Sequence, residues 1–384
     1  MAKLKNDELI RYHRHLVLDD FGANAQLKLK QSRVLVVGAG GLGCPVLLYL
    51  AAAGVSTIGI VDNDIVSLSN LQRQVLYTGE DVAKFKTDAA VNRLAMLNPN
   101  IRFNKYTNKI SKENALTIAG NYDVIVDASD NFPTRYLLND VCVLQDKPLV
   151  YGSILKFEGH IAVFNYQSKD GTFSANYRDL FTMPPDADSV PNCEQSGVLG
   201  VLPGMVGSMQ ANEAIKIITG VGEPIANKLL IIDALSLSFT TIALQNNNSR
   251  SLINGLVDYE DFCGINRDKN KYLNNKTTAM KEITVQELQA LKESGEDFQL
   301  IDVREPHEYD ICNLDGELIP MSQIPHNVEK ISKDKKVVVH CRSGKRSGDI
   351  VLWLEKNQGF ENLYNLKGGI LAWANEIDSD MPTY

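Results

Sequence analysis

The sequence predicts an α/β protein of two domains joined by a polar linker. Its 384 residues exceed the ~100–200 residues of a typical domain. Apolar runs typical of buried strands alternate with helix-like stretches in both halves of the chain, and a polar stretch separates the halves. We therefore expect one domain over residues 1–245, a linker over 246–280 and a second domain over 281–384.

The first domain begins with the pattern strand, glycine-rich turn, helix, strand. Apolar residues 34–37 precede the glycines, a helix-like stretch covers 45–53, and a second apolar run at 58–61 ends at Asp62. This order indicates a βαβ unit of a parallel sheet. Further elements are expected as strands at 124–126, 149–150 and 161–164 and a helix near 84–97. The pattern predicts a Rossmann-like domain with a mainly parallel sheet.

The second domain repeats this alternation on a smaller scale. A capped helix is expected over residues 284–291, and strands are expected at 298–301 and 337–340. The length after the linker suits one small α/β domain.

Charge and cysteine usage narrow the class of protein. The chain has 39 Lys and Arg against 47 Asp and Glu, a net charge of −8. This balance disfavours nucleic-acid and anionic-membrane partners, because both select a cationic surface. Polar residues stand at positions 6–8, where a signal peptide would have its apolar core. The scattered cysteines do not resemble a disulfide framework, so we expect a cytoplasmic protein with reduced thiols.

The glycine-rich turn reads Gly38-x-Gly40-x-x-Gly43, with a further glycine at Gly41. In this pattern the backbone can approach a phosphate closely, and the N-terminus of the following helix favours negative charge. Asp62 lies 19 residues after Gly43, where an acid can accept hydrogen bonds from ribose hydroxyls. The pattern alone is weak, since NAD binding or a tight turn without a ligand would also explain it.

The residues after the turn favour ATP over NAD. Arg73 and Lys86 supply two cations, and a triphosphate with roughly four negative charges needs such partners. Asp130 follows another apolar run and supplies an acid suited to Mg²⁺. A hydride-transfer enzyme has little use for this set.

Over about residues 5–245 the sequence closely resembles the MoeB/ThiF family of enzymes, which adenylate ubiquitin-like sulfur-carrier proteins. The resemblance is carried by Arg11-Tyr-His-Arg-His15, Gly38-Ala-Gly-Gly-Leu-Gly43, Asp62-Asn-Asp64, Asn70-Leu-Gln-Arg73, Lys86, Asp127-Ala-Ser-Asp130 and Val190-Pro-Asn-Cys-Glu-Gln-Ser-Gly-Val-Leu-Gly200. It implies that Gly41 approaches the phosphates and that Asp62 binds ribose. The implied nucleotide-binding residues are Gly38, Gly40, Gly41, Gly43, Asp62, Asn70, Arg73 and Lys86.

The same resemblance implies two further roles. Asp130 would hold Mg²⁺, and Arg14 would reach across a homodimer interface into the ATP site of the partner. There it would stabilise developing charge together with Arg73 and Lys86. Each residue also has an ordinary alternative: Arg14 and Lys86 as solvated helix residues, and Asp130 as a turn or helix-capping residue.

One family feature is missing from this chain. Many relatives carry a structural zinc in two C-x-x-C pairs, but here the first location reads Asn176-Tyr-Arg-Asp179 and the second retains only Cys263. Four thiolates cannot be assembled, so we expect no zinc. Cys193 occupies a position that in the family can accept an acyl group or relay sulfur, and a small half-buried residue is the equal alternative.

A second reactive site is expected at Cys341, which ends an apolar strand and precedes a helix. The loop after it contains Arg342, Lys345 and Arg346, and these cations with inward-turned N–H groups would stabilise a thiolate. A phosphatase of this kind needs an arginine six residues after the cysteine, where this chain has Ser347. A persulfide-carrying sulfurtransferase therefore fits better, with a buried structural cysteine as the plainer alternative.

Two other segments of the second domain support the sulfurtransferase interpretation. With Ile301-Asp-Val-Arg-Glu-Pro-His-Glu-Tyr309 and Leu366-Lys-Gly-Gly-Ile370, residues 281–384 closely resemble a single rhodanese domain. The resemblance implies that Cys341 carries a persulfide. We interpret Asp302 and Arg304 as structural, because their motif ends a strand and starts a turn.

The two resemblances together imply one enzyme. The first domain would use ATP and Mg²⁺ to adenylate the C-terminal glycine of a ubiquitin-like sulfur carrier ending in Gly-Gly. The second would pass on persulfide sulfur from a donor such as a cysteine desulfurase, leaving a thiocarboxylate. The expected catalytic residues are Arg14, Arg73, Lys86, Asp130, Cys193 and Cys341. An NAD-dependent oxidoreductase and a non-catalytic carrier-binding scaffold remain as alternatives, and the sequence does not select between molybdopterin, thiamin and other thiolation pathways.

Overall fold

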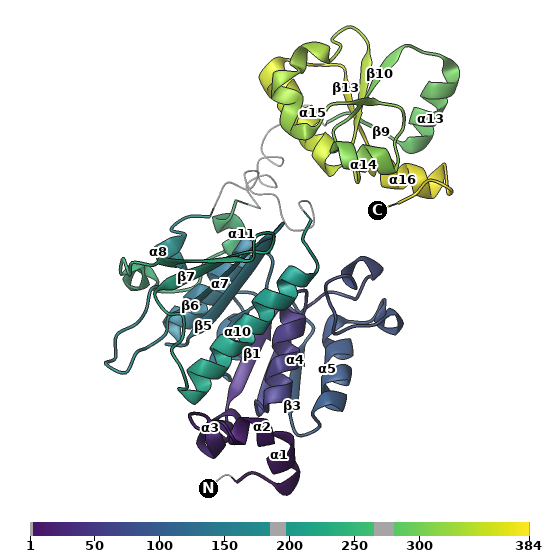
Figure 1. The fold of residues 1–384 in the computed structure, drawn as a ribbon. Coiled ribbons are helices and arrows are strands. Elements are labelled where there is room, and N and C mark those ends of the chain that lie inside the picture. The colour runs from purple at the N-terminus through teal and green to yellow at the C-terminus, as the bar shows by residue number, and fades with distance from the viewer. Residues whose placement is uncertain (1–2, 185–196, 265–279, 384) are drawn as a thin grey trace. The chain divides into compact units, whose positions relative to one another are not determined.

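The computed structural model describes residues 3–184, 197–264 and 280–383. The chain divides into two compact units, Met1–Leu273 and Asn274–Tyr384 (Figure 1). Each unit has its own sheet and its own hydrophobic core. Within the described residues, none of the helices has the length and apolar composition needed to cross a membrane.

The large unit is built on an eight-stranded sheet. Its strands run in the order β3-β2-β1-β4-β5-β6-β7-β8, parallel from β3 to β5 and antiparallel from β5 to β8. They are β1 (Arg33–Val37), β2 (Thr57–Val61), β3 (Arg102–Tyr106), β4 (Val124–Asp127), β5 (Leu149–Leu155), β6 (Glu158–Phe164), β7 (Lys228–Asp233) and β8 (Ser238–Ala243). The Rossmann-like, mainly parallel sheet expected from the sequence is confirmed.

Helices cover both faces of this sheet (Figure 1). One face carries α4 (Gly43–Ala53), α5 (Lys86–Leu97) and α10 (Val201–Thr219), and the other carries α6 (Ala115–Ala119), α7 (Phe132–Leu144), α8 (Tyr177–Leu180) and α11 (Tyr259–Phe262). Because strand side chains alternate between faces, Val34 and Val36 of β1 join the first core while Leu35 and Val37 join the second. This two-sided burial explains why β1 is a continuous apolar run.

Three short helices precede the sheet: α1 (Asn6–Arg11), α2 (His13–Leu16) and α3 (Gly22–Leu29). They lie at the end of α4 that is far from its first residue. Gln26 of α3 donates to the carbonyl of Ala53 at 2.8 Å, and the ring of His15 lies 2.9 Å from the same amide group.

Part of the stretch expected as linker packs on the large unit. A 3-10 turn, η3 (Ser249–Leu252), and α11 contact it, with Ser249 bound to Asn176 at 2.7 Å and Tyr259 buried. The polar composition of residues 246–264 therefore reflects a surface segment held by hydrogen bonds rather than free chain. Residues 265–279 lie outside the described ranges.

The small unit has a five-stranded, all-parallel sheet in the order β11-β10-β12-β13-β9. Its strands are β9 (Glu282–Ile283), β10 (Phe298–Asp302), β11 (Glu317–Leu318), β12 (Lys336–His340) and β13 (Leu363–Leu366). Its helices are α13 (Val285–Ser294), α14 (Pro306–Ile311), α15 (Lys345–Gln358) and α16 (Gly369–Glu376). Thr284 caps α13 through a capping box with Glu287, as its sequence predicted. The small α/β domain is confirmed.

Candidate functional sites

The glycine-rich turn joins the carboxyl end of β1 to α4. Gly38 has φ +98°, and a Cβ there would lie 2.4 Å from the carbonyl oxygen of Ala128, which follows β4. A Cβ at Gly43 would lie 1.9 Å from the carbonyl oxygen of Gly38. The fold itself therefore requires glycine at both positions.

The two middle glycines differ from the outer pair. A Cβ at Gly40 would meet nothing closer than Gln74 Nε2 at 3.6 Å, so packing does not require a glycine there. A Cβ at Gly41 would come within 3.0 Å of Pro203, with Arg73 Cγ at 3.6 Å. An uncrowded glycine ahead of a helix N-terminus suits close approach of a phosphate to the backbone.

Asp62, at the end of β2, holds the turn. Its carboxylate accepts from the N–H of Ala39 at 2.7 Å and from that of Asp64 at 2.8 Å. Burial raises the pKa of Asp62 above its usual value, and the ammonium of Lys86 opposes that shift. Each carboxylate oxygen retains a further lone pair, which suits a ribose hydroxyl.

Lys86 is not a solvated helix residue. It is the first residue of α5, its side chain is 7% exposed, and its ammonium binds the exposed carboxylate of Asp64 at 2.9 Å. A buried ammonium whose one ion pair among the described residues is to a solvent-facing carboxylate is placed to receive an anion.

Asn70 and Arg73 lie in the segment between β2 and α5. Asn70 Oδ1 accepts from the N–H of Ser67 at 3.2 Å, which shapes the 3-10 turn η1 (Leu68–Asn70). Arg73 donates to the carbonyl of Ser69 at 3.1 Å, and no carboxylate in the described ranges forms an ion pair with it. Its stem lies beside Gly41.

The carboxyl end of β4 supplies two acids. Asp130 is exposed, and its only hydrogen bond within the described residues comes from Asn131 at 3.5 Å. Asn131, not Asp130, caps α7 by accepting from the N–H of Thr134 at 3.0 Å, so the capping alternative for Asp130 is wrong.

Asp127 is a residue that the sequence reasoning did not single out. It is fully buried, and one carboxylate oxygen accepts from both the N–H and the hydroxyl of Ser129, at 3.0 and 2.6 Å. Its other oxygen has no hydrogen-bond partner in the described part of the chain, and burial raises its pKa. The sequence signal that could have identified Asp127 is its position as an acid at the end of an apolar strand, three residues before Asp130.

The structure brings most of the predicted nucleotide residues to one edge of the sheet. The turn lies close to Ala128 after β4, Ala39 bonds to Asp62, and Asp64 pairs with Lys86. A Cβ at Gly41 would lie 3.6 Å from Arg73 Cγ, so that side chain is also near the turn. This edge is the point where the strand order reverses at β1, the usual ligand position in such sheets.

One predicted residue is not brought to this edge. Arg14 is exposed on α2, beside the far end of α4. Cys193 lies outside the described residues.

An ion-paired cluster occupies the place where relatives are expected to bind zinc. Asn176 and Asp179 form a capping box at α8 rather than metal ligands, and Arg178 forms two bonds to Asp140 of α7 at 2.8 and 2.7 Å. Tyr259 also donates to Asp140 at 2.7 Å. Cys263 is buried, and burial raises its pKa to about 11, which disfavours the thiolate that zinc needs.

In the small unit, Cys341 follows β12 and is fully buried. The carbonyl of Cys341 accepts from the N–H of Ile370 at 2.9 Å, and a Cβ at Gly369 would lie 2.4 Å from the same oxygen. The hydroxyl of Ser347, on the first turn of α15, lies 3.4 Å from the sulfur. The loop is thus closed around the thiol by its own residues.

The cations of this loop divide into two kinds. Arg342 and Lys345 are exposed. Arg346 instead forms two bonds of 2.7 Å to the carboxylate of Glu308 on α14, so its charge is compensated. The sequence had grouped all three as stabilisers of the thiolate.

Asp302 and Arg304 form a fully buried ion pair with an N···O distance of 2.6 Å. Arg304 also donates to the carbonyl of Cys312 at 2.7 Å. His340, buried beside Asp302 at 3.7 Å, has its pKa lowered to about 4 by desolvation and is neutral at pH 7. These contacts fit the structural interpretation of Asp302 and Arg304.

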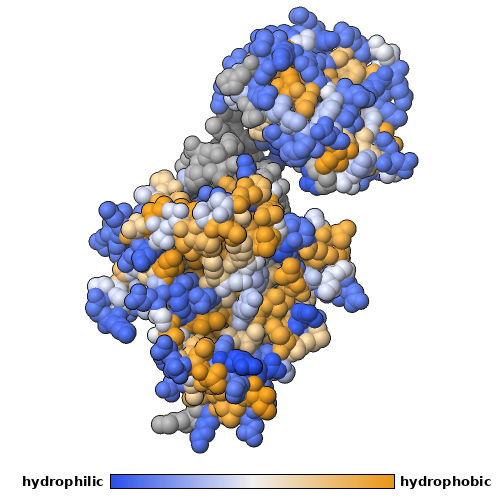
Figure 2. Space-filling model, in the orientation of Figure 1, coloured by the Kyte–Doolittle hydropathy of each residue, from blue (hydrophilic) through white to orange (hydrophobic). Residues whose placement is uncertain are grey.

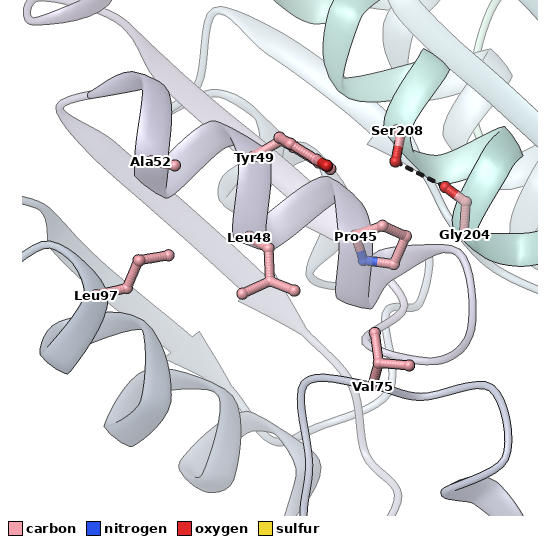
Figure 3. A pocket seen from close by; sticks show the side chains of 8 residues that line it. All are labelled: Pro45, Leu48, Tyr49, Ala52, Val75, Leu97, Gly204 and Ser208. Carbon is pink, nitrogen blue, oxygen red and sulfur yellow. Dashed lines mark hydrogen bonds between the residues drawn. The ribbon is translucent and has the colours of Figure 1, made fainter. Parts of the chain in front are cut away.

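An apolar hollow of about 410 Å³ lies over α4, between α10 on one side and the end of α5 on the other (Figure 3). It contains none of the residues predicted for the nucleotide site. It is lined by Pro45, Leu48, Tyr49, Ala52, Val75, Leu97, Gly204 and Ser208.

Comparison with known proteins finds a family for each of the two units. Residues 12–253 match the ThiF family, and residues 284–376 match the rhodanese-like domain. The chain is 45% identical to a probable adenylyltransferase/sulfurtransferase MoeZ of Mycobacterium tuberculosis over 386 residues, covering 100% of this chain and 97% of that protein. It is 39% identical to the adenylyltransferase and sulfurtransferase MOCS3 of Drosophila virilis, covering 100% and 87%.

Solved structures agree on the fold of the large unit. PaaA matches with a TM-score of 0.53 and 25% identity over 64% of this chain and 76% of its own. Escherichia coli MccB, solved with ATP, matches with a TM-score of 0.53 and 22% identity over 63% and 73%. The chain therefore belongs to the ThiF family, and with its C-terminal rhodanese-like domain it is an adenylyltransferase and sulfurtransferase.

Proposed function

We propose that the large unit adenylates the C-terminal glycine carboxylate of a ubiquitin-like sulfur carrier ending in Gly-Gly. The small unit then delivers persulfide sulfur from Cys341 to form a thiocarboxylate. The observation that carries this proposal is the phosphate-type turn with the buried Lys86 at its edge, in one chain with a rhodanese-like cysteine loop.

The adenylation step follows from the charges at the sheet edge. A carrier carboxylate oxygen attacks the α-phosphorus of ATP, and the bond to the β-phosphate oxygen breaks to release pyrophosphate. Lys86 and Arg73 stabilise the negative charge that develops on the phosphates. Asp130, exposed and weakly bonded, would hold Mg²⁺, which when bound supplies further neutralisation of phosphate charge.

The sulfur step uses the acyl-adenylate as an electrophile. The outer persulfide sulfur of Cys341 attacks the acyl carbon, and AMP leaves. A thiol then cleaves the sulfur–sulfur bond, takes the place of the transferred sulfur and releases the thiocarboxylate. Cys193 and an external thiol are the two candidates for that reductant.

A homodimer in which Arg14 acts on the partner's site fits the geometry of α4. This helix begins at the turn and ends near α2. Its 11 residues span about 16 Å, and Arg14 lies at the end that is far from its own turn. A two-fold axis that passes the outer side of α4, perpendicular to the helix and level with its middle, sets the second copy's α4 antiparallel to the first. It would bring α2 of each copy next to the turn of the other.

The outer surface of α4 and α10 is suited to contact a second copy of this chain. Hydrophobic side chains cover much of this face (Figure 2), and the apolar hollow opens on it. Tyr49 is 56% exposed and Val75 67% exposed. Burying such a surface in a symmetric contact is favourable.

The proposal is tested by pyrophosphate exchange into ATP with a carrier ending in Gly-Gly. We expect exchange that depends on the carrier. NAD binding without exchange, or carrier binding without exchange, would overturn the assignment.

The dimer is tested by mixing two inactive variants, Arg14→Ala and Asp130→Ala. Random pairing gives half mixed dimers, each with one intact site, so about a quarter of the wild-type exchange should return on mixing. Arg11→Ala, an exposed arginine of the neighbouring α1, is the matched control for Arg14→Ala and should keep its activity. No recovery on mixing would place Arg14 outside the partner's site.

We also propose that the enzyme works without zinc. The Arg178–Asp140 pair, with the Arg178 guanidinium 4.7 Å from the Phe262 ring centre, joins α8 and α11 to α7 by side-chain contacts alone. Elemental analysis of protein purified without chelator should find less than stoichiometric zinc. One zinc per chain would contradict this.

A further inference from the structure

Ser347 and Asn365 form a short polar chain that ends on the sulfur of Cys341. Ser347 Oγ lies 3.4 Å from the sulfur and 2.7 Å from Asn365 Oδ1. All three side chains are buried, with exposed fractions of 0%, 0% and 3%. Because these three polar groups are shielded from water, each depends on the others for its hydrogen bonds.

Counting protons shows that this chain has two states. The hydroxyl has one hydrogen, and at 2.7 Å it is donated to Asn365 Oδ1. In that state Ser347 offers the sulfur only lone pairs, which suits a thiol, because a thiol can itself donate. A thiolate needs the hydroxyl hydrogen, and Asn365 Oδ1 would then face Ser347 Oγ with no hydrogen between them.

The amide of Asn365 can remove this conflict by turning over. Rotation by half a turn replaces Oδ1 with Nδ2, which donates to Ser347 Oγ and frees the hydroxyl for the sulfur. The amide has nearly the same shape in both orientations, so packing does not oppose the turn. Even a Cβ placed on Gly348 would lie 3.4 Å from Nδ2, which is ordinary van der Waals contact. Glu282, which accepts from Nδ2 at 3.5 Å, is exposed and can move into water.

We propose that Ser347 is a catalytic residue of the sulfurtransferase. Its hydroxyl donates to the Cys341 sulfur when that sulfur is charged, and Asn365 is the positioning residue that reverses the hydroxyl. This inference rests on the proposed role of Cys341 as sulfur carrier. Charge-assisted hydrogen bonds in buried sites are the strong ones, so one such bond shifts the balance from thiol to thiolate appreciably.

The reaction that benefits is loading of the cysteine from a persulfide donor. The thiolate attacks the outer sulfur of R–S–SH, the donor's sulfur–sulfur bond breaks, and R–S⁻ leaves with the bonding electrons. Cys341 becomes Cys341–S–SH, and no outside oxidant is needed. Ser347 thus lies six residues after the cysteine, at the position that carries an arginine in the phosphatase pattern, and supplies a neutral donor there.

The test is the rate of Cys341 alkylation by iodoacetamide in the full-length protein, followed across pH by mass spectrometry of the peptide that contains Cys341. Ser347→Ala should move the midpoint of the pH profile upward by about one unit, which is about tenfold less thiolate at pH values below both midpoints. Ser347→Thr retains the hydroxyl and should restore the wild-type midpoint. Ser343→Ala, an exposed serine of the same loop, should leave it unchanged.

Asn365→Asp separates the chemical role from a structural one. An ionised carboxylate of nearly the same size can only accept, so it holds the hydroxyl hydrogen, and its negative charge also disfavours a nearby thiolate. Both effects should raise the midpoint, at least as far as Ser347→Ala does. Midpoints equal to wild type in both variants would overturn the proposal. A failure of Cys341 itself as carrier would appear differently, as normal sulfur transfer by Cys341→Ala, and would not depend on these midpoints.

Discussion

The two reactive loops of this protein share a local design and differ in what encloses them. Each follows a central parallel strand and leads into a helix, and each needs glycines where another segment crosses it closely. In the turn after β1, Gly40 has no neighbouring atom that would crowd a side chain. The cations near this turn are Lys86 and Arg73, which could bind an anion. The loop after β12 closes on Cys341 with its own hydroxyl and pairs Arg346 with Glu308.

The difference shows how one local motif serves two chemistries. A triphosphate brings its own negative charge, so its site offers cations and the backbone N–H groups at a helix N-terminus. A thiolate or persulfide is small and carries a single charge, so its loop can enclose the sulfur and supply neutral donors. In the first site Lys86 pairs only with the exposed Asp64 among the described residues, whereas in the second Arg346 is held by the buried Glu308.

The largest expected effect would separate the two sites completely. Cys341→Ala should abolish sulfur transfer from the rhodanese-like domain while carrier-dependent pyrophosphate exchange continues, because the nucleophile itself is removed. Asp130→Ala should do the reverse, losing exchange while persulfide loading of Cys341 continues. Mass spectrometry of the carrier, for replacement of oxygen by sulfur, and the exchange assay measure the two outcomes.

Either variant gives a decisive contrary result. Thiocarboxylate formed by Cys341→Ala at the wild-type rate from a persulfide donor would show that this loop is not the sulfur source. Normal exchange by folded Asp130→Ala would remove that acid from the ATP site.

A smaller effect would test why Gly40 is a glycine: because a phosphate approaches its backbone, or because neighbouring atoms leave no room for a side chain. Gly43→Ala places a Cβ 1.9 Å from the Gly38 carbonyl and should lower the melting temperature and abolish exchange together. Gly40→Ala has room for its methyl group, so its melting temperature should match wild type while its KM for ATP rises about tenfold or more. A normal KM for ATP in Gly40→Ala would mean that phosphate does not approach this residue.

The smallest expected effect is an acid sensitivity confined to the small unit. The folded pKa of His340 is about 4 against an ordinary 6.5, so the unfolded chain binds a proton first as the pH falls. The contribution of His340 to stability is present above pH 6.5 and is lost towards pH 4. Between pH 7.5 and pH 5 the free energy of unfolding should fall by about 2 kcal/mol.

Tryptophan fluorescence isolates this effect, because both tryptophans, Trp353 and Trp373, lie in the small unit. Urea unfolding of the full chain followed by this signal should show the loss, and His340→Leu should flatten it. A wild-type midpoint in urea that does not change between the two pH values would contradict the assignment of a buried neutral histidine.

Local sequence patterns predicted much of the fold and many of the candidate site residues. Apolar runs predicted β1, β2, β4, β5, β6, β10 and β12, because strands buried on both faces are largely apolar. Three strands of the large unit left no such signal: β3 has mixed burial, β8 is exposed along its whole length, and β7 was not separated from its surroundings. In the small unit β9, β11 and β13 were not predicted as strands. Helix α15 begins at Lys345, four residues before the helical stretch at residue 349 that the sequence indicated, because the loop after Cys341 turns directly into it.

The sequence by itself determined which residues could do chemistry at this protein's two loops: the glycines of the turn, the cations and acids after it, and a cysteine that ends a strand. Only the tertiary structure decided how each one is used. The tertiary structure buries Lys86 in an ion pair with Asp64 and pairs Arg346 with Glu308. It leaves Arg14 exposed near the end of α4 that is far from its own nucleotide site. It also places the amide of Asn365 in hydrogen-bond contact with the Ser347 hydroxyl. The reason is physical: spacing along the chain sets which groups are near in a strand or helix, whereas charge compensation and proton sharing depend on contacts between segments far apart in sequence.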